Sequence, residues 1–126
     1  MREINARQGQ SKFRKDLRNL YGDQCMLTGC NLIEIVEAAH ISPYRGKEDN
    51  HPSNGILLRA DLHTLFDIDL LSIHPQSLEV HIHPRVYAAG YQYLHGRILI
   101  CLNPPRPSIE ALKDRWLLFQ MRLISN

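Results

Sequence analysis

The sequence has no long apolar run and few cysteines, and its charges nearly cancel. No stretch of the 126 residues approaches the roughly 20 apolar residues of a membrane span, so we expect no membrane partner. The opening residues Met1–Arg7 lack the apolar core of a signal peptide. Three cysteines, an odd number, argue against a disulfide framework and fit a reducing compartment. These absences together predict a cytoplasmic protein.

The composition that is present fits one globular domain. A net charge of +2 excludes a polycation, so any surface for nucleic acid must be a local patch. The hydrophobic fraction of 44% is enough for a core and excludes a disordered chain. We expect residues 1–126 to form a single domain of ordinary size. Histidine is the unusual residue, with seven copies, and it both binds metals and titrates near neutrality.

Hydrophobic periodicity predicts a mixed order of helices and strands in the first half of the chain. An apolar stripe at helical spacing predicts a helix from about residue 8 to Tyr21, ended by Gly22. Runs rich in Ile, Val and Leu predict strands at about 32–41 and at 56–58, separated by a loop over 43–55. A two-turn helix over about 60–67 then buries three side chains, Leu62, Leu65 and Phe66.

The second half predicts a hairpin, a strand and a last helix. The hairpin joins Leu70–Ile73 to Leu78–Ile82, and Arg97–Leu102 is a further apolar run that predicts a strand. Ser108 has the character of an N-cap for a helix through about Arg122. Its core side has residues at helical spacing, namely Ile109, Leu112, Trp116 and Phe119. The fold class predicted is therefore α+β.

Three polar residues in the middle of the chain suggest a site. His40 ends the first predicted strand, Asn54 lies in a Ser-Asn-Gly turn, and His63 lies on the short helix. His63 and Asp67 are four residues apart and so share one helix face. Each residue alone has an ordinary structural interpretation, such as a surface hydrogen bond. The order strand-His, turn-Asn, helix-His with short gaps is what points to chemistry.

These residue types suit phosphodiester hydrolysis. A neutral histidine at a strand end can act as a general base for water near pH 7. An asparagine in a turn can bridge backbone groups and hold the loop that orients that histidine. An imidazole and a carboxylate on one helix face suit Mg²⁺, Mn²⁺ or Zn²⁺, and a divalent cation can stabilise the leaving 3′ oxygen.

The same residues resemble the HNH endonuclease family, whose core is the ββα-metal fold. The resemblance rests on Ala38–Tyr44, on the turn Ser53–Gly55, and on Leu58–Asp67 with its Leu-His-x-Leu-Phe-Asp helix. Three further stretches resemble that branch of the family, Arg7–Arg14, Cys25–Gly29 and Tyr91–Ile100. The resemblance implies a small ββα-metal core over about 25–74, with an added N-terminal helix, β-hairpin and C-terminal helix.

Carried over by position, the resemblance implies a role for each residue. It makes His40 the general base, Asn54 the brace of the loop, and His63 a metal ligand. Many members place a ligand immediately before the base, where this chain has Ala39. Asp67 is the expected replacement, because colicin-type members use two helix residues four apart, and Glu37 is a weaker candidate.

Other side chains offer alternative sites. Basic residues flanking the core are candidate DNA contacts, namely Arg7, Arg14, Arg18, Arg45 and Arg59. A zinc site at the hairpin histidines is disfavoured against exposed strand histidines, since no fourth ligand accompanies His74, His81 and His83. Cys25 and Cys30 read as packing residues rather than half a zinc site, and His51 is a minor candidate for the main site.

The function predicted is a metal-dependent endonuclease that hydrolyses DNA phosphodiester bonds, leaving a 5′ phosphate and 3′ hydroxyl as the resemblance implies. Mg²⁺ or Mn²⁺ is the expected cofactor and DNA the expected partner. Alternatives are a structure-specific nickase, an RNA-acting member, and a catalytically silent nucleic-acid-binding module of the same fold. A homodimer and a domain of a larger protein both stay open, and a parent in restriction or phage defence is an expectation by analogy.

Overall fold

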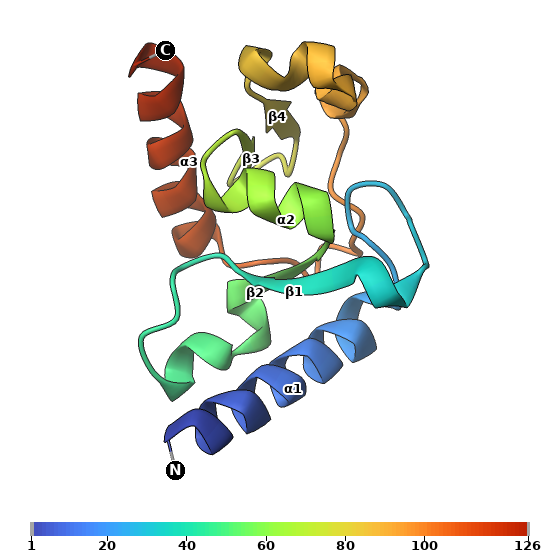
Figure 1. The fold of residues 1–126 in the computed structure, drawn as a ribbon, viewed down its shortest axis with the longest axis vertical. Helices are drawn as coiled ribbons and strands as arrows, with labels where there is room; N and C mark the ends of the chain where they lie inside the picture. The colour runs from blue at the N-terminus through green and yellow to red at the C-terminus, as the bar shows by residue number, and fades with distance from the viewer. Residues whose placement is uncertain (1, 126) are drawn as a thin grey trace.

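The computed structural model describes residues 2–125, and their side chains from residue 10 onward. The described residues form three α-helices and two small antiparallel sheets, which confirms the α+β class; Figure 1 shows their arrangement. In chain order the helices and strands are α1 Arg2–Tyr21, β1 Val36–His40, β2 Gly55–Arg59, α2 Ala60–Asp67, β3 Leu71–Ile73, β4 Val80–Ile82 and α3 Ile109–Ser125.

The two sheets are antiparallel hairpins. In the first hairpin β1 pairs with β2, so that Val36 lies opposite Arg59 and His40 lies opposite Gly55. In the second, β3 pairs with β4, with Leu71 opposite Ile82. The first hairpin therefore carries the candidate base at one end and leads into α2 from the other.

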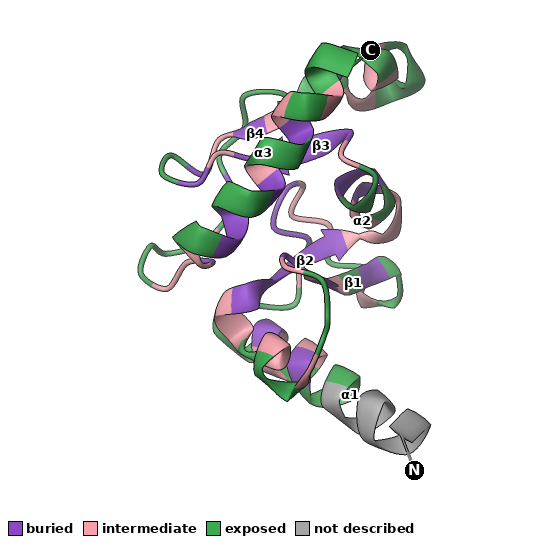
Figure 2. Cartoon of the chain, turned by 90° about the vertical axis from the view of Figure 1, so that its left-hand side faces the viewer, coloured by how far each residue is buried: buried purple, intermediate pink, exposed green. Residues whose placement is uncertain are grey.

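The first hairpin is sandwiched between two helices. Figures 1 and 2 place α1 on one side of β1 and β2 and α2 on the other. Phe13 and Leu17 of α1 are fully buried, as are Leu62 and Phe66 of α2. The left-handed φ of +90° at Gly22 ends α1, because glycine adopts this conformation without a Cβ clash. The helix predicted over 60–67 is thus confirmed with its buried side.

The last helix packs its inner side against the second hairpin (Figure 2). Its start is the predicted N-cap, where Ser108 Oγ accepts a hydrogen bond from the Ala111 amide at 3.2 Å. The prediction of its core side is right for Leu112 and Phe119 only: Ile109 is 42% exposed and Trp116 is half-buried.

Arg115 takes a core position of α3 that the pattern did not predict. Its guanidinium donates to the Phe66 carbonyl, lies over the Phe66 ring, and contacts Asp69 Oδ1 at 3.3 Å. The Phe66 carbonyl belongs to the last turn of α2, where it also accepts from the Asp69 amide at 3.3 Å. Arg115 therefore caps the helix that carries His63.

The predicted start of the first strand is wrong. Residues Ile33–Ile35 form a 3₁₀ turn, because Arg14 Nη2 takes the carbonyls of Ile33 and Val36 at 2.9 and 3.3 Å and the Ile35 amide bonds back to Leu32. The strand consequently begins at Val36. The loop over 43–55 contains two further 3₁₀ turns, Lys47–Asn50 and Pro52–Asn54.

The segment Arg97–Leu102 is not a strand. It makes one isolated bridge, between Glu79 and Ile98. Its backbone changes partners along its length, since the Leu99 amide bonds to Leu78 and the Ile100 amide bonds to Met26. Its apolar residues are mostly outside the core, with Leu102 84% exposed. A single bridge is too little pairing for a strand with either neighbour.

Over the described residues, every helix is too short or too polar to cross a membrane.

Candidate functional site

His40 stands at the carboxyl end of β1 on the side of the hairpin that faces α1. Its ring stacks on the Phe13 ring, with centroids 4.1 Å apart and planes within 5°. Tyr44 lies tilted at 5.5 Å. His40 Nε2 contacts Asn50 Oδ1 at 2.8 Å. The imidazole is therefore half-buried in a defined orientation at the hairpin end.

Asn54 joins the end of β1 to the loop that follows. Its Oδ1 accepts from the Ser42 amide at 2.8 Å, and its Nδ2 donates to the carbonyls of Ser42 and Asp49 at 3.1 and 2.9 Å. Its own carbonyl accepts from the Ile41 amide. The side chain is buried with these bonds satisfied, as a buried amide requires. These are the bridging contacts that the Ser-Asn-Gly turn predicted.

His63, Asp67 and Glu37 form a cluster on the other side of the hairpin, toward α2. His63 Nδ1 lies 2.7 Å from Glu37 Oε1, and His63 Nε2 lies 3.3 Å from Asp67 Oδ2. Carboxylate oxygens only accept, so His63 Nδ1 carries the proton in the hydrogen bond to Glu37, while the contact of Nε2 with Asp67 is an ion pair when His63 is protonated. With those protons lost, the cluster offers imidazole nitrogen and carboxylate oxygen to a cation.

The donor set of this cluster fits a divalent cation in chemistry. One imidazole and two carboxylates suit Mg²⁺, Mn²⁺ or Zn²⁺. In the part of the chain that the structure describes, no three His, Cys, Asp or Glu side chains converge on one point as a formed metal site. The cluster is instead held together by the hydrogen bond from His63 to Glu37 and the ion pair with Asp67. It lies on the opposite side of the hairpin from His40, and no hydrogen bond or ion pair between described residues joins the two.

Ala39 occupies the position where a ligand was expected, and it is fully buried in the core. Because side chains alternate along a strand, Glu37 and Ala39 belong to the same face of β1. The carboxylate that contacts His63 is thus that of Glu37, two residues before Ala39 on the same face of β1.

The candidate DNA contacts divide into arginines with structural partners and one without. Arg14 holds the backbone before β1, and Arg18 forms two hydrogen bonds to Asp23 at 2.8 and 3.1 Å. Arg59 is similarly engaged by Asp61. Arg45 is exposed, and no described residue bonds to its guanidinium. Arg7 belongs to α1, but its side chain lies outside the described residues.

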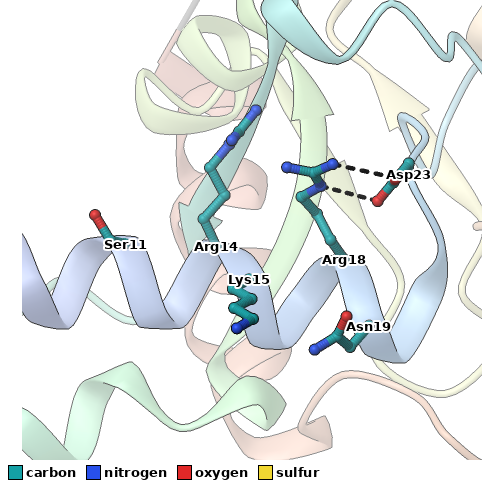
Figure 3. A pocket seen from close by; sticks show the side chains of 6 residues that line it. All are labelled: Ser11, Arg14, Lys15, Arg18, Asn19 and Asp23. Atoms are coloured by element: carbon teal, nitrogen blue, oxygen red, sulfur yellow. Dashed lines mark hydrogen bonds and ion pairs between the residues drawn. The ribbon is translucent and has the colours of Figure 1, made fainter.

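A hollow of about 450 Å³ runs along the outer side of α1 (Figure 3). Figure 3 shows the Arg18 guanidinium turned toward Asp23, with Lys15 on the same stretch of helix. Its lining residues are Ser11, Arg14, Lys15, Arg18, Asn19 and Asp23. Three cationic side chains against one carboxylate leave the hollow net positive, which suits a phosphate.

A network at the start of α2 ties this helix to the segment after the second hairpin. Asp61 accepts from Arg59 Nε at 2.7 Å and from the Tyr91 hydroxyl at 2.8 Å. Arg59 is the main cause that lowers the pKa of Asp61, and the bond to Asp61 raises the pKa of Tyr91. The ionised carboxylate therefore stabilises the fold above its ordinary pKa, and this contribution is lost as pH falls through the lowered value.

Three of the other histidines, His51, His74 and His83, hold local turns, and His95 Nδ1 accepts from the Ile82 amide. His83, expected to be exposed, is 4% exposed, and its Nδ1 accepts from the Arg85 amide. His81 contacts Glu79 at 2.9 Å, and His74 Nδ1 accepts from the amides of Gln76 and Ser77. His51 caps a 3₁₀ turn through Ser53. Of the cysteines, Cys25 is buried and Cys30 half-buried, and all three are free thiols.

Sequence reasoning missed Asn50, Tyr91 and Arg115. Asn50 lies in a polar loop where many residues could face His40, so only the fold selects it. Tyr91 and Arg115 reach α2 from distant parts of the chain. An arginine at a core position of an amphipathic pattern was the one available signal, at Arg115.

The hairpin of β1 and β2 followed by α2, with a histidine at the end of the first strand, is a ββα arrangement. Residues 25–74 match the family model described as HNH endonuclease. The match is to that segment, 50 of the 126 residues, and it is the segment that carries β1, β2 and α2.

Comparison with solved structures found the same fold. The chain is similar to a chain titled "Modification dependent TagI restriction endonuclease", with a TM-score of 0.55 and 20% sequence identity. The likeness covers 82% of this chain and 36% of that one, so this chain spans about a third of that protein's length. No curated protein sequence matched significantly.

Proposed function

We propose that this chain is a metal-dependent endonuclease that hydrolyses DNA, with residues 1–126 acting as one nuclease domain. The observation that carries the proposal is the setting of His40. Its ring is stacked on Phe13, the loop beside it is braced by Asn54, and Nδ1 has no hydrogen-bond partner among the described residues. A fixed imidazole with an open nitrogen is what a general base for water requires.

In the proposed reaction His40 removes a proton from a water molecule. The resulting hydroxide attacks phosphorus, and the bond from phosphorus to the 3′ oxygen breaks. The products are a 5′ phosphate and a 3′ hydroxyl, the leaving oxygen acquiring a proton from solvent. Asn54 contributes by holding the loop, and so the direction of His40, while it makes no contact with the reacting atoms.

His63, Asp67 and Glu37 would hold the divalent cation. When bound, such a cation neutralises charge on the scissile phosphate and stabilises the leaving oxygen as a Lewis acid. Glu37 and Asp67 also orient the His63 ring from its two nitrogens. Orientation of a ligating imidazole by a carboxylate is the arrangement that usually tunes its affinity for metal.

Contact with the DNA backbone is assigned to Arg45 and to the hollow on α1. Arg45 lies on the loop that follows the base and has a free guanidinium among the described residues. Arg14 and Arg18 would present their remaining N–H groups to phosphate. Such contacts fix the register of the duplex without reading its sequence.

A plasmid-nicking assay with Mg²⁺ or Mn²⁺ tests the cation site. We expect the wild-type chain to nick and EDTA to abolish nicking. His63→Ala should lower the rate by about 10²-fold or more, while Glu37→Gln should raise the metal concentration needed by about 10- to 100-fold. Calorimetric titration with Mn²⁺ in the absence of DNA should show that both variants bind Mn²⁺ more weakly than the wild-type chain does.

His81→Ala is the matched control for His63→Ala. The two side chains are similarly exposed, 29% and 24%, and each contacts a glutamate. We expect His81→Ala to nick at the wild-type rate. Equal loss in both variants, or nicking that persists in EDTA, would contradict the assignment.

A further inference from the structure

A side chain from the loop before β2 contacts the candidate base directly. Asn50 ends the 3₁₀ turn Lys47–Asn50, and its Oδ1 lies 2.8 Å from His40 Nε2. An amide oxygen has no proton to give, so Nε2 must carry the proton in this bond. The tautomer that results leaves Nδ1 with its lone pair.

The rest of the environment keeps the ring in this orientation. Phe13, which is fully buried, covers one face of the imidazole in a parallel stack. A parallel stack permits rotation within the ring plane but resists tilting, so a contact at the ring edge is needed to choose which nitrogen points where. The bond from Asn50 is that edge contact.

The turn that carries Asn50 is itself fixed by Asn54. Asn54 Nδ2 donates to the Asp49 carbonyl, next to Asn50 in the chain, at 2.9 Å. The turn is closed by the bond from the His51 amide to the Glu48 carbonyl. Asn54 thus fixes the backbone of the turn, and the Asn50 side chain, which this turn carries, contacts His40.

We propose that Asn50 is a positioning residue, which keeps the proton of His40 on Nε2 so that Nδ1 is the atom that accepts the proton of water. The inference rests on the proposed function for its catalytic meaning. It differs from the role of Asn54, which touches only backbone. An amide nitrogen in the place of Oδ1 would donate to Nε2 and select the opposite tautomer.

Nitrogen NMR of the histidine-labelled chain, at a pH where His40 is neutral, tests the tautomer without DNA or metal. We expect the wild type to have its proton on Nε2 and Asn50→Ala to show a mixture of tautomers. Asn50→Asp keeps the acceptor and removes the donor, so it should retain the Nε2 proton. A proton on Nδ1 in the wild type would overturn the proposal.

Cleavage kinetics test the consequence. Asn50→Ala should lower kcat by about 10- to 100-fold with KM for DNA nearly unchanged, since ring placement affects proton transfer rather than binding. Asn50→Asp should recover most of that loss. Asn31→Ala, the same deletion at an exposed asparagine, should have no effect.

The two possible failures are distinguishable. If the wild type does not cleave, the proposed function fails, while the NMR result still decides the tautomer. If the wild type cleaves and Asn50→Ala cleaves equally well, or Asn50→Asp is no better than Asn50→Ala, the role of Asn50 is wrong.

Discussion

At the scale of single residues, the site differs from its expected pattern by one strand repeat. The ligand expected at Ala39 is absent, and its neighbour on the same face, Glu37, supplies a carboxylate to His63 instead. Ala39 is fully buried, whereas the Glu37 side chain is 50% exposed. A carboxylate at position 39 would need to be desolvated in the core, and this costs several kcal/mol unless it is paired. Position 37 avoids that cost.

The arginines also differ in role at this scale. A pair of variants should separate an arginine that contacts DNA from one that stabilises the fold. Arg45→Ala should weaken DNA binding and reduce the salt dependence of affinity by about one counterion, because its guanidinium is free to meet a phosphate. Arg14→Ala should lower the free energy of unfolding, since two carbonyls before β1 lose their donor. Salt-dependent affinity and urea denaturation measure the two effects. A destabilised Arg45→Ala with unchanged affinity would contradict the division.

At the scale of elements, the contact of α1 with the hairpin sets the position of the base. A Cβ at Gly55 would lie 2.4 Å from Phe13 Cζ and 2.7 Å from a Leu17 methyl. Gly55 therefore allows α1 to approach β2 closely enough for Phe13 to stack on His40. In the Ser-Asn-Gly turn, Gly55 therefore makes room for the close packing of α1, whereas its neighbour Asn54 holds the preceding loop through its hydrogen bonds.

Gly55→Ala tests that contact. We expect it to lower the free energy of unfolding by about 1–3 kcal/mol through overpacking, and to reduce cleavage because Phe13 must move. Gly46→Ala is the control, since a Cβ there meets only the flexible carboxylate of Glu48. Urea denaturation of both variants measures the difference. Gly55→Ala as stable as Gly46→Ala would show that α1 tolerates displacement.

An element could be predicted from the sequence when the residues that determine it lie close together in the chain. The helix over 60–67 was predictable because its apolar spacing, its length and its buried side all agree within eight residues. The irregular conformation of Arg97–Leu102 was not, because its hydrogen-bond partners, Leu78 and Met26, are far apart in sequence. The site followed the same division: His40, Asn54 and His63 stand in local motifs, while Asn50 meets His40 only through the folded loop.

At the scale of the whole molecule, the family match covers only the central part of the chain, residues 25–74. The helices outside it nonetheless complete the site. From α1, Phe13 stacks on the base, and from α3, Arg115 caps the end of α2. The segment that the family model matches is thus contacted by two helices, α1 and α3, that the match does not include.

The most direct test of the account is cleavage by His40→Ala at saturating Mn²⁺ under single-turnover conditions. We predict a rate lower by about 10²- to 10⁴-fold, with DNA affinity and the free energy of unfolding close to wild type, because the variant loses the general base and keeps the cation and phosphate contacts. His40→Ala that cleaves at the wild-type rate would contradict the account.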